Sequence, residues 1–462
     1  MAIVTNKFKR ETIQLIKDNF DNASNHYYIG IGRSDVWNAT DTAPVAYANL
    51  NEERLFRNSL QSVKKVGDMS FVVPRHNWSS GTTYSAYSDN LVTNYPNLHH
   101  YYVMNDNNQV FICVQQGKNS QGESVVSTVQ PTTTASGAST GTVFVTSDGY
   151  AWKFLYTISA LDASKFMSAE FIPVKKQIGS GSQSTDTEQL AAQNAAVDGQ
   201  IIGYRVVSEG LGYSSAPTLT VVGDGTLAQA IATVHDGKVK KVDVVDGSGT
   251  LLLGSGYTNA IVTQTGGSPT TEAKIVPIFA PKGGLGSDPR ADLRSTGIMF
   301  VIQPDGTEND DFIIDNDFRQ VGLIKNPLQT VGGSAFTSTT GIALRRLTLA
   351  SGGASFTKDN VIVGLTSTAK AIIDKVNLVG GVYSLSFHQN DETGYGTFNA
   401  NEAGETIEEV VGSGTGSVAA GSGTTVAGEI ATTTGEVLYI DNRAAVTRAS
   451  DQKEDIKIVI QI

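Results

Sequence analysis

Cysteine is almost absent from this chain of 462 residues, because Cys113 is the only one. A single thiol cannot form a disulfide within the chain, which fits a reducing compartment. Cys113 lies in the apolar run Val110–Val114. We therefore predict a buried strand residue rather than a reactive thiol, since free cysteine usually behaves as a small hydrophobe.

Charge and long apolar runs are also scarce. Charged residues make up 17% of the chain, compared with about 25% in an average globular protein. The 34 Lys and Arg are outnumbered by 45 Asp and Glu, giving a net charge of −11 without a basic block. Nucleic-acid binding is therefore not expected, because it needs a cationic surface against the phosphates. No run approaches the roughly 18 apolar residues of a membrane helix, and no signal peptide is recognisable, so we expect neither a membrane nor an export segment.

The spacings that metal and catalytic sites need are missing as well. His26, His76 and the pair His99-His100 do not form a His-x-x-x-His or similar zinc-binding pattern. The acidic stretch Asp305–Asp311 lacks the glycine of a calcium-binding loop. Gly137–Gly141 fits the nucleophile-elbow pattern but lies in a Thr/Ser/Gly tract, not between a strand and a helix. We predict no metal, no cofactor and no catalytic residue.

What the chain has in excess is glycine, 48 residues, together with many short β-prone runs. This composition predicts a mainly β fold with tight turns and a few helices on connections. Two helices are expected near the start, over Lys7–Phe20 and over Asn51–Lys65, the second with Gly67 as its stop. The last strand is expected over Asp455–Ile462, where isoleucines alternate with other residues. Further strands are predicted around residues 71–73, 101–103, 110–114, 142–145, 152–158, 297–302, 321–324, 342–349, 360–365, 369–376 and 383–387.

An internal repeat marks the middle of the chain. Gly210–Ala216 recurs 44 residues later as Gly254–Ala260, and each copy leads into two β-prone runs. A duplicated unit of this kind predicts a small β-module. The stretch 331–428 is again rich in Gly, Thr and Ser, and it ends in the low-complexity segment Gly412–Gly428, which we interpret as a linker.

Several short strings occur in the order known from one family of phage proteins. They are Ala2–Phe8; Gly32–Ser34 with Trp37; Val73–Arg75 with Trp78; Asp148–Trp152; Phe318–Gln320 leading to Asn326–Leu328; Gly435–Tyr439 with Asn442-Arg443; and Glu454–Ile458. In these strings the chain resembles the baseplate wedge protein of contractile, T-even-like phage tails, the gene product eight family. It departs from the family at Ala444-Ala445, where prolines are usual.

This resemblance implies a layered β-sandwich with helices at its sides. It implies a core formed by residues 1–175, 286–330 and 429–462, with inserted β-rich modules at 176–285 and 331–428. It further implies a homodimer that contacts other wedge subunits in the virion, after assembly in the host cytoplasm. The function implied is structural: baseplate assembly and relay of the change that triggers sheath contraction.

The family-like strings also supply the candidate anchor residues for a core or an interface. They are Arg33, Trp37, Arg75, Trp78, Trp152, Arg319, Asn326, Asn442 and Arg443. Arg and Trp are favoured interface anchors, although a Trp in the core with Arg covering it is the alternative. The same two alternatives apply to the tyrosines at positions 84, 87, 95, 101 and 102.

Two other classes of function stay open from the sequence. A receptor- or glycan-binding fibre or adhesin protein is the alternative function, since exposed aromatic rings at Tyr213, Tyr257 and Tyr395 would suit sugars. A polysaccharide-degrading enzyme would need two carboxylates facing each other across a cleft, which a sequence does not reveal.

Overall fold

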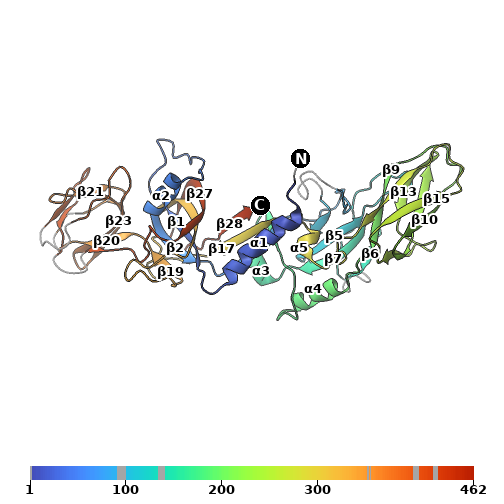
Figure 1. Cartoon of the computed structure of the whole chain (residues 1–462). Coiled ribbons are helices and arrows are strands. Elements are labelled where there is room, and N and C mark those ends of the chain that lie inside the picture. The colour runs from blue at the N-terminus through green and yellow to red at the C-terminus, as the bar shows by residue number, and fades with distance from the viewer. Residues whose placement is uncertain are drawn as a thin grey trace. The chain divides into compact units, whose positions relative to one another are not determined.

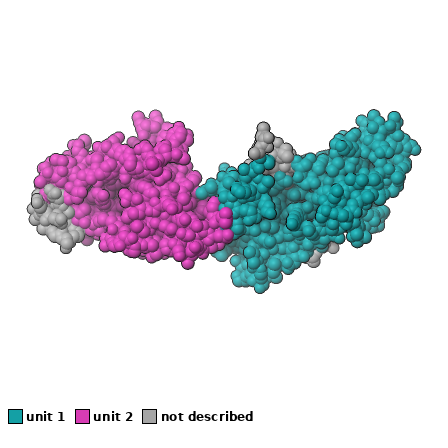
Figure 2. Space-filling model, in the orientation of Figure 1, with its two compact units in different colours: residues 1–14, 70–299, 459–462 teal, residues 15–69, 300–458 magenta. Residues whose placement is uncertain are grey.

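The computed structural model covers the chain and describes residues 3–90, 100–133, 141–350, 353, 355–398, 405–419 and 425–462. It confirms the mainly β fold class, with several antiparallel sheets and helices on connections (Figure 1). The chain forms two compact units (Figure 2). Unit 1 holds residues 1–14, 70–299 and 459–462, and unit 2 holds residues 15–69 and 300–458.

The first predicted helix is confirmed as α1 (Asn6–Asp21), whereas the second is only half right. Helix α2 spans Leu50–Asn58 with Asn49 as its cap, and the chain then turns into strand β2 (Leu60–Lys65). The end of α2 is fixed at Ser59, whose N–H donates to Leu55 O and whose hydroxyl donates to Gln320 Oε1 at 2.9 Å. Pairing of β2 in a sheet thus overrides the helical charge pattern, because tertiary context outweighs weak propensities.

Three further helices connect strands: α3 (Ala160–Phe166), α4 (Ser184–Asn194) and α5 (Pro289–Asp292). Helix α4 lies in a polar tract without an apolar stripe. Its buried side chains include Gln189 and Gln193, which donate to the carbonyls of Lys175 at 2.6 Å and Gln177 at 2.9 Å. Hydrogen bonds thus engage the amide N–H groups of both side chains, whereas Gln189 Oε1 is buried with no hydrogen-bond partner among the described residues.

Unit 1 contains a sheet in the order β4-β5-β7-β6. Its strands are β4 (Tyr102–Met104), β5 (Gln109–Gln115), β7 (Ala151–Thr157) and β6 (Val143–Val145). Cys113 is fully buried there, and burial raises the pKa of its thiol, as expected for an unreactive cysteine. A second four-stranded sheet has the order β28-β17-β3-β8, with β28 (Ile456–Gln461), β17 (Gly297–Ile302), β3 (Asp68–Pro74) and β8 (Phe171–Val174).

The repeat forms a β-module in unit 1, and its two copies are joined by strand pairing and by hydrogen bonds from one copy to the other. The first strands of the two copies, β10 (Thr218–Gly223) and β15 (Ala260–Thr265), pair with each other. The hydroxyl of Tyr213 accepts the N–H of Ala273 at 2.7 Å, and that of Tyr257 accepts the N–H of Ala228 at 3.4 Å. The other strands of the module are β9 (Ile201–Ser208), β11 (Thr226–Ala228), β12 (Ile231–His235), β13 (Lys238–Asp243), β14 (Leu253–Ser255) and β16 (Lys274–Phe279).

Unit 2 is built on a five-stranded sheet in the order β19-β2-β1-β18-β27. Its remaining strands are β19 (Thr340–Ile342), β1 (Tyr27–Gly32), β18 (Asp317–Lys325) and β27 (Glu436–Thr447). Phe56 of α2 packs into the core of this sheet with Tyr28, Leu60 and Phe336. Strand β19 and Phe336 come from the segment 331–428, so the beginning of that predicted module contributes to the five-stranded sheet.

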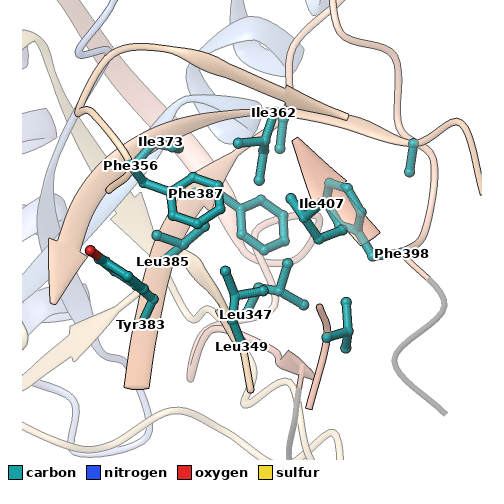
Figure 3. Packing of buried hydrophobic residues seen from close by; sticks show 13 residues of the cluster. Leu347, Leu349, Phe356, Ile362, Ile373, Tyr383, Leu385, Phe387, Phe398 and Ile407 are labelled. Atoms are coloured by element: carbon teal, nitrogen blue, oxygen red, sulfur yellow. The ribbon is translucent and has the colours of Figure 1, made fainter. Parts of the chain in front are cut away.

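The rest of that segment forms a seven-stranded sheet with its own core (Figure 3). Phe356 packs on Tyr383 and Phe387 on Phe398, each with ring centroids 5.5 Å apart. The strands in order are β25 (Thr415–Ser417), β24 (Thr406–Glu409), β21 (Val361–Gly364), β22 (Lys370–Val379), β23 (Val382–His388), β20 (Arg345–Thr348) and β26 (Thr425–Val426).

The interpretation of Gly412–Gly428 as a linker is wrong where the segment is described. It contains β25 and β26, and each pairs with a neighbouring strand. A Cβ atom at Gly414 would overlap the ring of Phe356, so the small residues let the chain approach the core closely.

Candidate assembly surface of unit 2

Five of the nine predicted anchor residues gather around one loop of unit 2, residues 33–41, which we call the anchor loop. At its start Arg33 has a positive φ of 61°. Its guanidinium carbon lies 4.1 Å from the ring centroid of Trp37, and it donates to Val36 O at 3.2 Å. A cation–π contact of this kind stabilises the turn locally. Burial lowers the pKa of Arg33, although neighbouring carboxylates favour its charge.

Arg319 fastens the end of the anchor loop to strand β18. Its side chain is 4% exposed and forms an ion pair with Asp41 at 2.8 Å and another with Asp317 at 3.0 Å. It also donates to the carbonyl oxygen of Ser34. The hydrogen bonds from Arg319 hold the pKa of Asp41 below its usual range. A buried guanidinium with several acceptors is the favourable case for such a pair.

Trp37 and Asn442 connect the same region to strand β27. The indole N–H of Trp37 donates to the carbonyl of Arg443 at 2.9 Å. Gln320 of β18 donates to Asn442 Oδ1 of β27 at 2.8 Å. The side chain of Arg443 is exposed. The structure thus joins predicted anchors that lie more than 400 residues apart in the sequence, because β18 and β27 are neighbours in one sheet.

A buried charge cluster connects the anchor loop to the seven-stranded sheet. His388 on β23 contacts Asp374 Oδ2 at 2.7 Å through Nδ1 and Asp35 Oδ2 at 3.1 Å through Nε2. Ser34 donates to Asp374 Oδ1 at 2.7 Å. The side chains of His388 and Asp374 are 3% and 0% exposed. Two carboxylates around one imidazole hold two separate segments of unit 2 together.

Burial and the neighbouring charges have opposite effects on the pKa of His388. Burial alone would lower its pKa, but Asp374 and Asp35 outweigh that effect and raise the pKa to about 10. The pKa of Asp35 is lowered, because hydrogen bonding and charge from His388 outweigh burial. Ser34 bonds a carboxylate and not the imidazole, and both imidazole nitrogens face carboxylates. The arrangement therefore does not activate a serine nucleophile, which would need a hydrogen bond to the imidazole.

Strand β27 lies at the edge of the five-stranded sheet and borders a shallow groove of about 280 Å³. One wall is residues 437–440 of β27, and the other is residues 46–49 with Glu53. Tyr47 is 66% exposed and Leu438 is 47% exposed. Large exposed apolar side chains around an open strand edge are typical of a surface that another protein chain covers.

The other four predicted anchors are structural. Trp152 is fully buried in unit 1, and Trp78 packs against the same core while donating to Ser127 Oγ at 3.1 Å. Arg75 donates to Ser168 O at 3.0 Å. Asn326 has a φ of 51° and accepts the N–H of His26 at 2.7 Å. These residues therefore hold the local chain rather than form an exposed interface.

The tyrosines offered as interface or sugar-binding residues are mostly covered. The aromatic rings at positions 84, 87, 101 and 102 are buried, which favours the packing alternative. Tyr213 and Tyr257 are each 5% exposed, so the expectation that they are exposed is wrong. Tyr395 is 49% exposed, and its hydroxyl contacts Asp391 at 2.7 Å and Asn58 at 2.6 Å. In the repeat, Tyr213 and Tyr257 are used for internal hydrogen bonds.

Tyr95, His99 and the Gly137–Thr140 part of the nucleophile-elbow pattern lie outside the described residues.

Other features that could bear chemistry lie in unit 1. His76 stacks on His100 at 4.1 Å between centroids, and burial lowers the pKa of His76 to about 4. A cavity of about 360 Å³ has four cations, Lys118, Arg205, Lys240 and Lys241, among its lining residues. Three of these are already in ion pairs: Arg205 with Asp89, Lys240 with Glu209 and Lys241 with Asp243. Within the described ranges, no group of three His, Cys, Asp or Glu is placed to hold a metal ion, and no helix has the length and apolarity to cross a membrane.

Sequence reasoning missed Asp35, Asp374 and His388. They are separated by up to 353 residues, and each stands alone in its local sequence. The one local signal is that His388 stands at the end of an apolar β-prone run. A histidine at such a position can be either buried or exposed, so this signal does not predict the cluster. Neither a family model nor a curated protein matches this chain.

Proposed function

We propose that this chain is a structural subunit of a contractile phage tail, in the baseplate wedge. The ordered family-like strings support this assignment, and so does the mainly β fold with helices on connections. In this role the chain assembles with itself and with other wedge subunits and passes on the movement that triggers sheath contraction. It acts through binding surfaces rather than through turnover of a substrate.

The observation that carries the proposal is the open edge of β27 beside the anchor loop. Trp37 and Arg319 hold the anchor loop to β27 and β18, and the exposed side chains of Tyr47 and Leu438 line the groove beside β27. A held loop beside exposed apolar side chains suits a subunit that is buried among neighbours, since interfaces need ordered side chains and apolar contact.

The test is the composition of purified phage particles. We expect quantitative mass spectrometry to find the chain in isolated tails, in a fixed ratio to other baseplate proteins. A nonsense mutation in its gene should arrest baseplate assembly. Particles that assemble and contract without the chain would refute the proposal, and its presence only at fibre tips would favour the receptor-binding alternative.

The homodimer is part of the same proposal. A stable dimer needs roughly 1,200–2,000 Å² of total buried surface. Each chain carries a net charge of −11, so two chains repel one another at long range. Apolar contact must dominate, and we expect light scattering at micromolar concentration to show a dimer that persists or tightens in high salt. A monomer at both salt concentrations would refute the free dimer.

A further inference from the structure

Strand β27 stands out among the sheet edges of unit 2 by its length. It has 12 residues, whereas the opposite edge of the same sheet, β19, has three. The edges of the seven-stranded sheet, β25 and β26, have three and two residues. Over residues 436–442 the backbone of β27 is hydrogen-bonded only to β18 within the described residues. A long open edge pairs readily with another chain, so β27 is a candidate interface.

The side chains of β27 alternate between its two faces, with one irregularity. Val437 and Ile440 both pack against the core of the five-stranded sheet. They are three residues apart, a spacing that would place them on opposite faces of a regular strand. The register with β18 shifts between them, which makes Leu438 an extra residue in the ladder. This β-bulge changes which residues of β27 share a face.

The outer face of β27 carries charges that are complementary to themselves when the strand is reversed. Tyr439, Asp441 and Arg443 alternate along the strand, and because of the bulge Glu436 shares their face. Glu436 is 71% exposed, and its one ion-pair partner among the described residues is Lys325 at 4.0 Å. Arg443 is exposed and is in no ion pair within the described residues. Two such strands that run antiparallel bring the carboxylate of one to the guanidinium of the other.

Exposed apolar side chains beside the edge extend this surface. Val36, Val45, Tyr47 and Leu50 are all more than half exposed, and they belong to the anchor loop and the segment that follows it. Residues 46–49 form the second wall of the groove beside β27. A dimer of two chains with a net charge of −11 each needs such apolar contact, because long-range repulsion opposes association.

We propose that β27 pairs with β27 of a second copy in an antiparallel, two-fold symmetric ladder centred on Ile440. The two-fold axis is perpendicular to the sheet, so the sheets of the two copies join into one. In this register Glu436 of each copy lies opposite Arg443 of the other, and Tyr439 lies opposite Asp441. The bulge allows this pairing, since without it Glu436 and Arg443 would point to opposite faces. This inference rests on the proposed homodimer and identifies its surface.

The mixed charge of the edge favours a second copy over an unrelated segment. The outer face of β27 carries both carboxylates and a guanidinium, so neither a purely basic nor a purely acidic segment matches it. A second copy carries the matching pattern in the matching order, because the two-fold axis reverses the strand. The same axis brings the exposed apolar side chains of both copies to one interface.

Cysteine cross-linking in the full chain tests the register. Cys113 is the only cysteine and is fully buried, so an introduced cysteine is the only accessible thiol. The Glu436→Cys chain and the Arg443→Cys chain are oxidised separately and as an equimolar mixture. We expect a disulfide-linked dimer in the mixture and little in either chain alone, because residue 436 faces 443 and lies about 20 Å from its own counterpart. A mixture of Glu436→Cys with Leu378→Cys, at an exposed leucine of β22, controls for random collision and should give no dimer.

Charge reversal tests the pairing across the two-fold axis. Glu436→Arg or Arg443→Glu alone puts like charges opposite each other, and we expect the dissociation constant of the dimer to rise at least about tenfold at low salt. The double variant Glu436→Arg/Arg443→Glu restores opposite charges and should dimerise within about threefold of the parent chain. Both positions are exposed, so neither change should unfold the protein. Sedimentation equilibrium of the four chains gives the dissociation constants.

The outcomes separate this inference from the proposed function. A dimer that forms without the cross-link, and that both single reversals leave unchanged, would overturn the pairing of β27 while the homodimer stands. A monomer at every concentration would overturn both. Slower hydrogen exchange of residues 436–442 in assembled tails, but not in the free dimer, would show that another subunit covers the edge and would overturn the second copy as its occupant. None of these results alters the particle composition test, which decides the assembly function.

Discussion

Replacing His388 by Gln should destabilise unit 2 in a pH-dependent manner. The change removes the cation that Asp374 and Asp35 share and leaves two carboxylates around a neutral side chain. Asp374 is fully buried, so water cannot take over the role of the imidazolium. Breaking a buried ion pair by removing one partner typically costs about 3–5 kcal/mol.

The raised pKa of His388 gives a second estimate of the stabilisation free energy that is lost in the His388→Gln variant. The difference between about 10 in the folded chain and 6.5 in the unfolded chain corresponds to about 5 kcal/mol, at about 1.4 kcal/mol for each pKa unit. Because the folded pKa is the higher one, this contribution is fully present below pH 6.5 and is lost as the pH rises through 10. About 3 kcal/mol of it should disappear between pH 6 and pH 9.

The assay is native hydrogen exchange of β22 and β23, followed by mass spectrometry. Comparing the parent chain with the His388→Gln variant at the same pH cancels the intrinsic exchange rate. We expect the variant to lose several kcal/mol of protection at pH 6 and much less at pH 9. His235→Gln, a change at a partly exposed histidine of unit 1, is the control and should alter protection in neither strand.

Equal loss of protection at pH 6 and pH 9 would refute the reasoning. It would mean that His388 acts by packing alone and that its charge contributes nothing. No loss at either pH would mean that the cluster does not hold the anchor loop to the seven-stranded sheet.

Three further predictions concern the frame around the sites. Tyr213→Phe should destabilise the repeat module by about 1–3 kcal/mol and Tyr257→Phe by less. The hydroxyl of Tyr213 accepts the N–H of Ala273 at 2.7 Å and donates to Gln264 Oε1 at 2.5 Å, whereas that of Tyr257 accepts one N–H at 3.4 Å. Thermal unfolding would show the order, and the reverse order would contradict this reasoning. Asn326→Ala should cost about 1–3 kcal/mol by urea unfolding, since the variant keeps the positive φ and leaves the N–H of His26 without its acceptor; an unchanged midpoint would refute this role. Replacing residues 345–427 by a short linker should leave a soluble, cooperatively folding chain, whereas removing 331–428 should not, because the longer deletion takes β19 and Phe336 with it; aggregation of both, judged by size-exclusion chromatography, would contradict the modular interpretation.

Most strands could be predicted because their signal is local. Alternating or continuous apolar runs bounded by turn residues mark β5, β7, β10, β15 and β28. Helix α4 could not be found in this way, since its buried face carries glutamines. The extent of α2 was also beyond local reasoning. Its charge pattern favours a helix to Lys65, but β1 takes Leu60–Lys65 as a partner strand.

For the candidate site, too, the sequence identified residues, whereas the fold determined which of them lie close together. The anchor residues were identifiable as Arg, Trp and Asn in family-like strings, yet nothing in those strings says that five of them meet and four do not. That outcome depends on which strands become neighbours in the sheet. The placement of β18 between β1 and β27 brings Arg319 under the anchor loop and Asn442 beside Gln320.

The sequence by itself determined the mainly β class, the duplicated module and a single buried thiol, because composition, periodicity and repetition are properties of short stretches of chain. Only the tertiary structure decided that Asp35, Asp374 and His388 form one cluster and that β27 is an open edge. Both depend on contacts between residues far apart in the sequence, such as the 353 residues that separate Asp35 from His388. A local sequence pattern does not predict such a contact, because the same side chain is solvated or buried depending on which distant part of the chain packs against it.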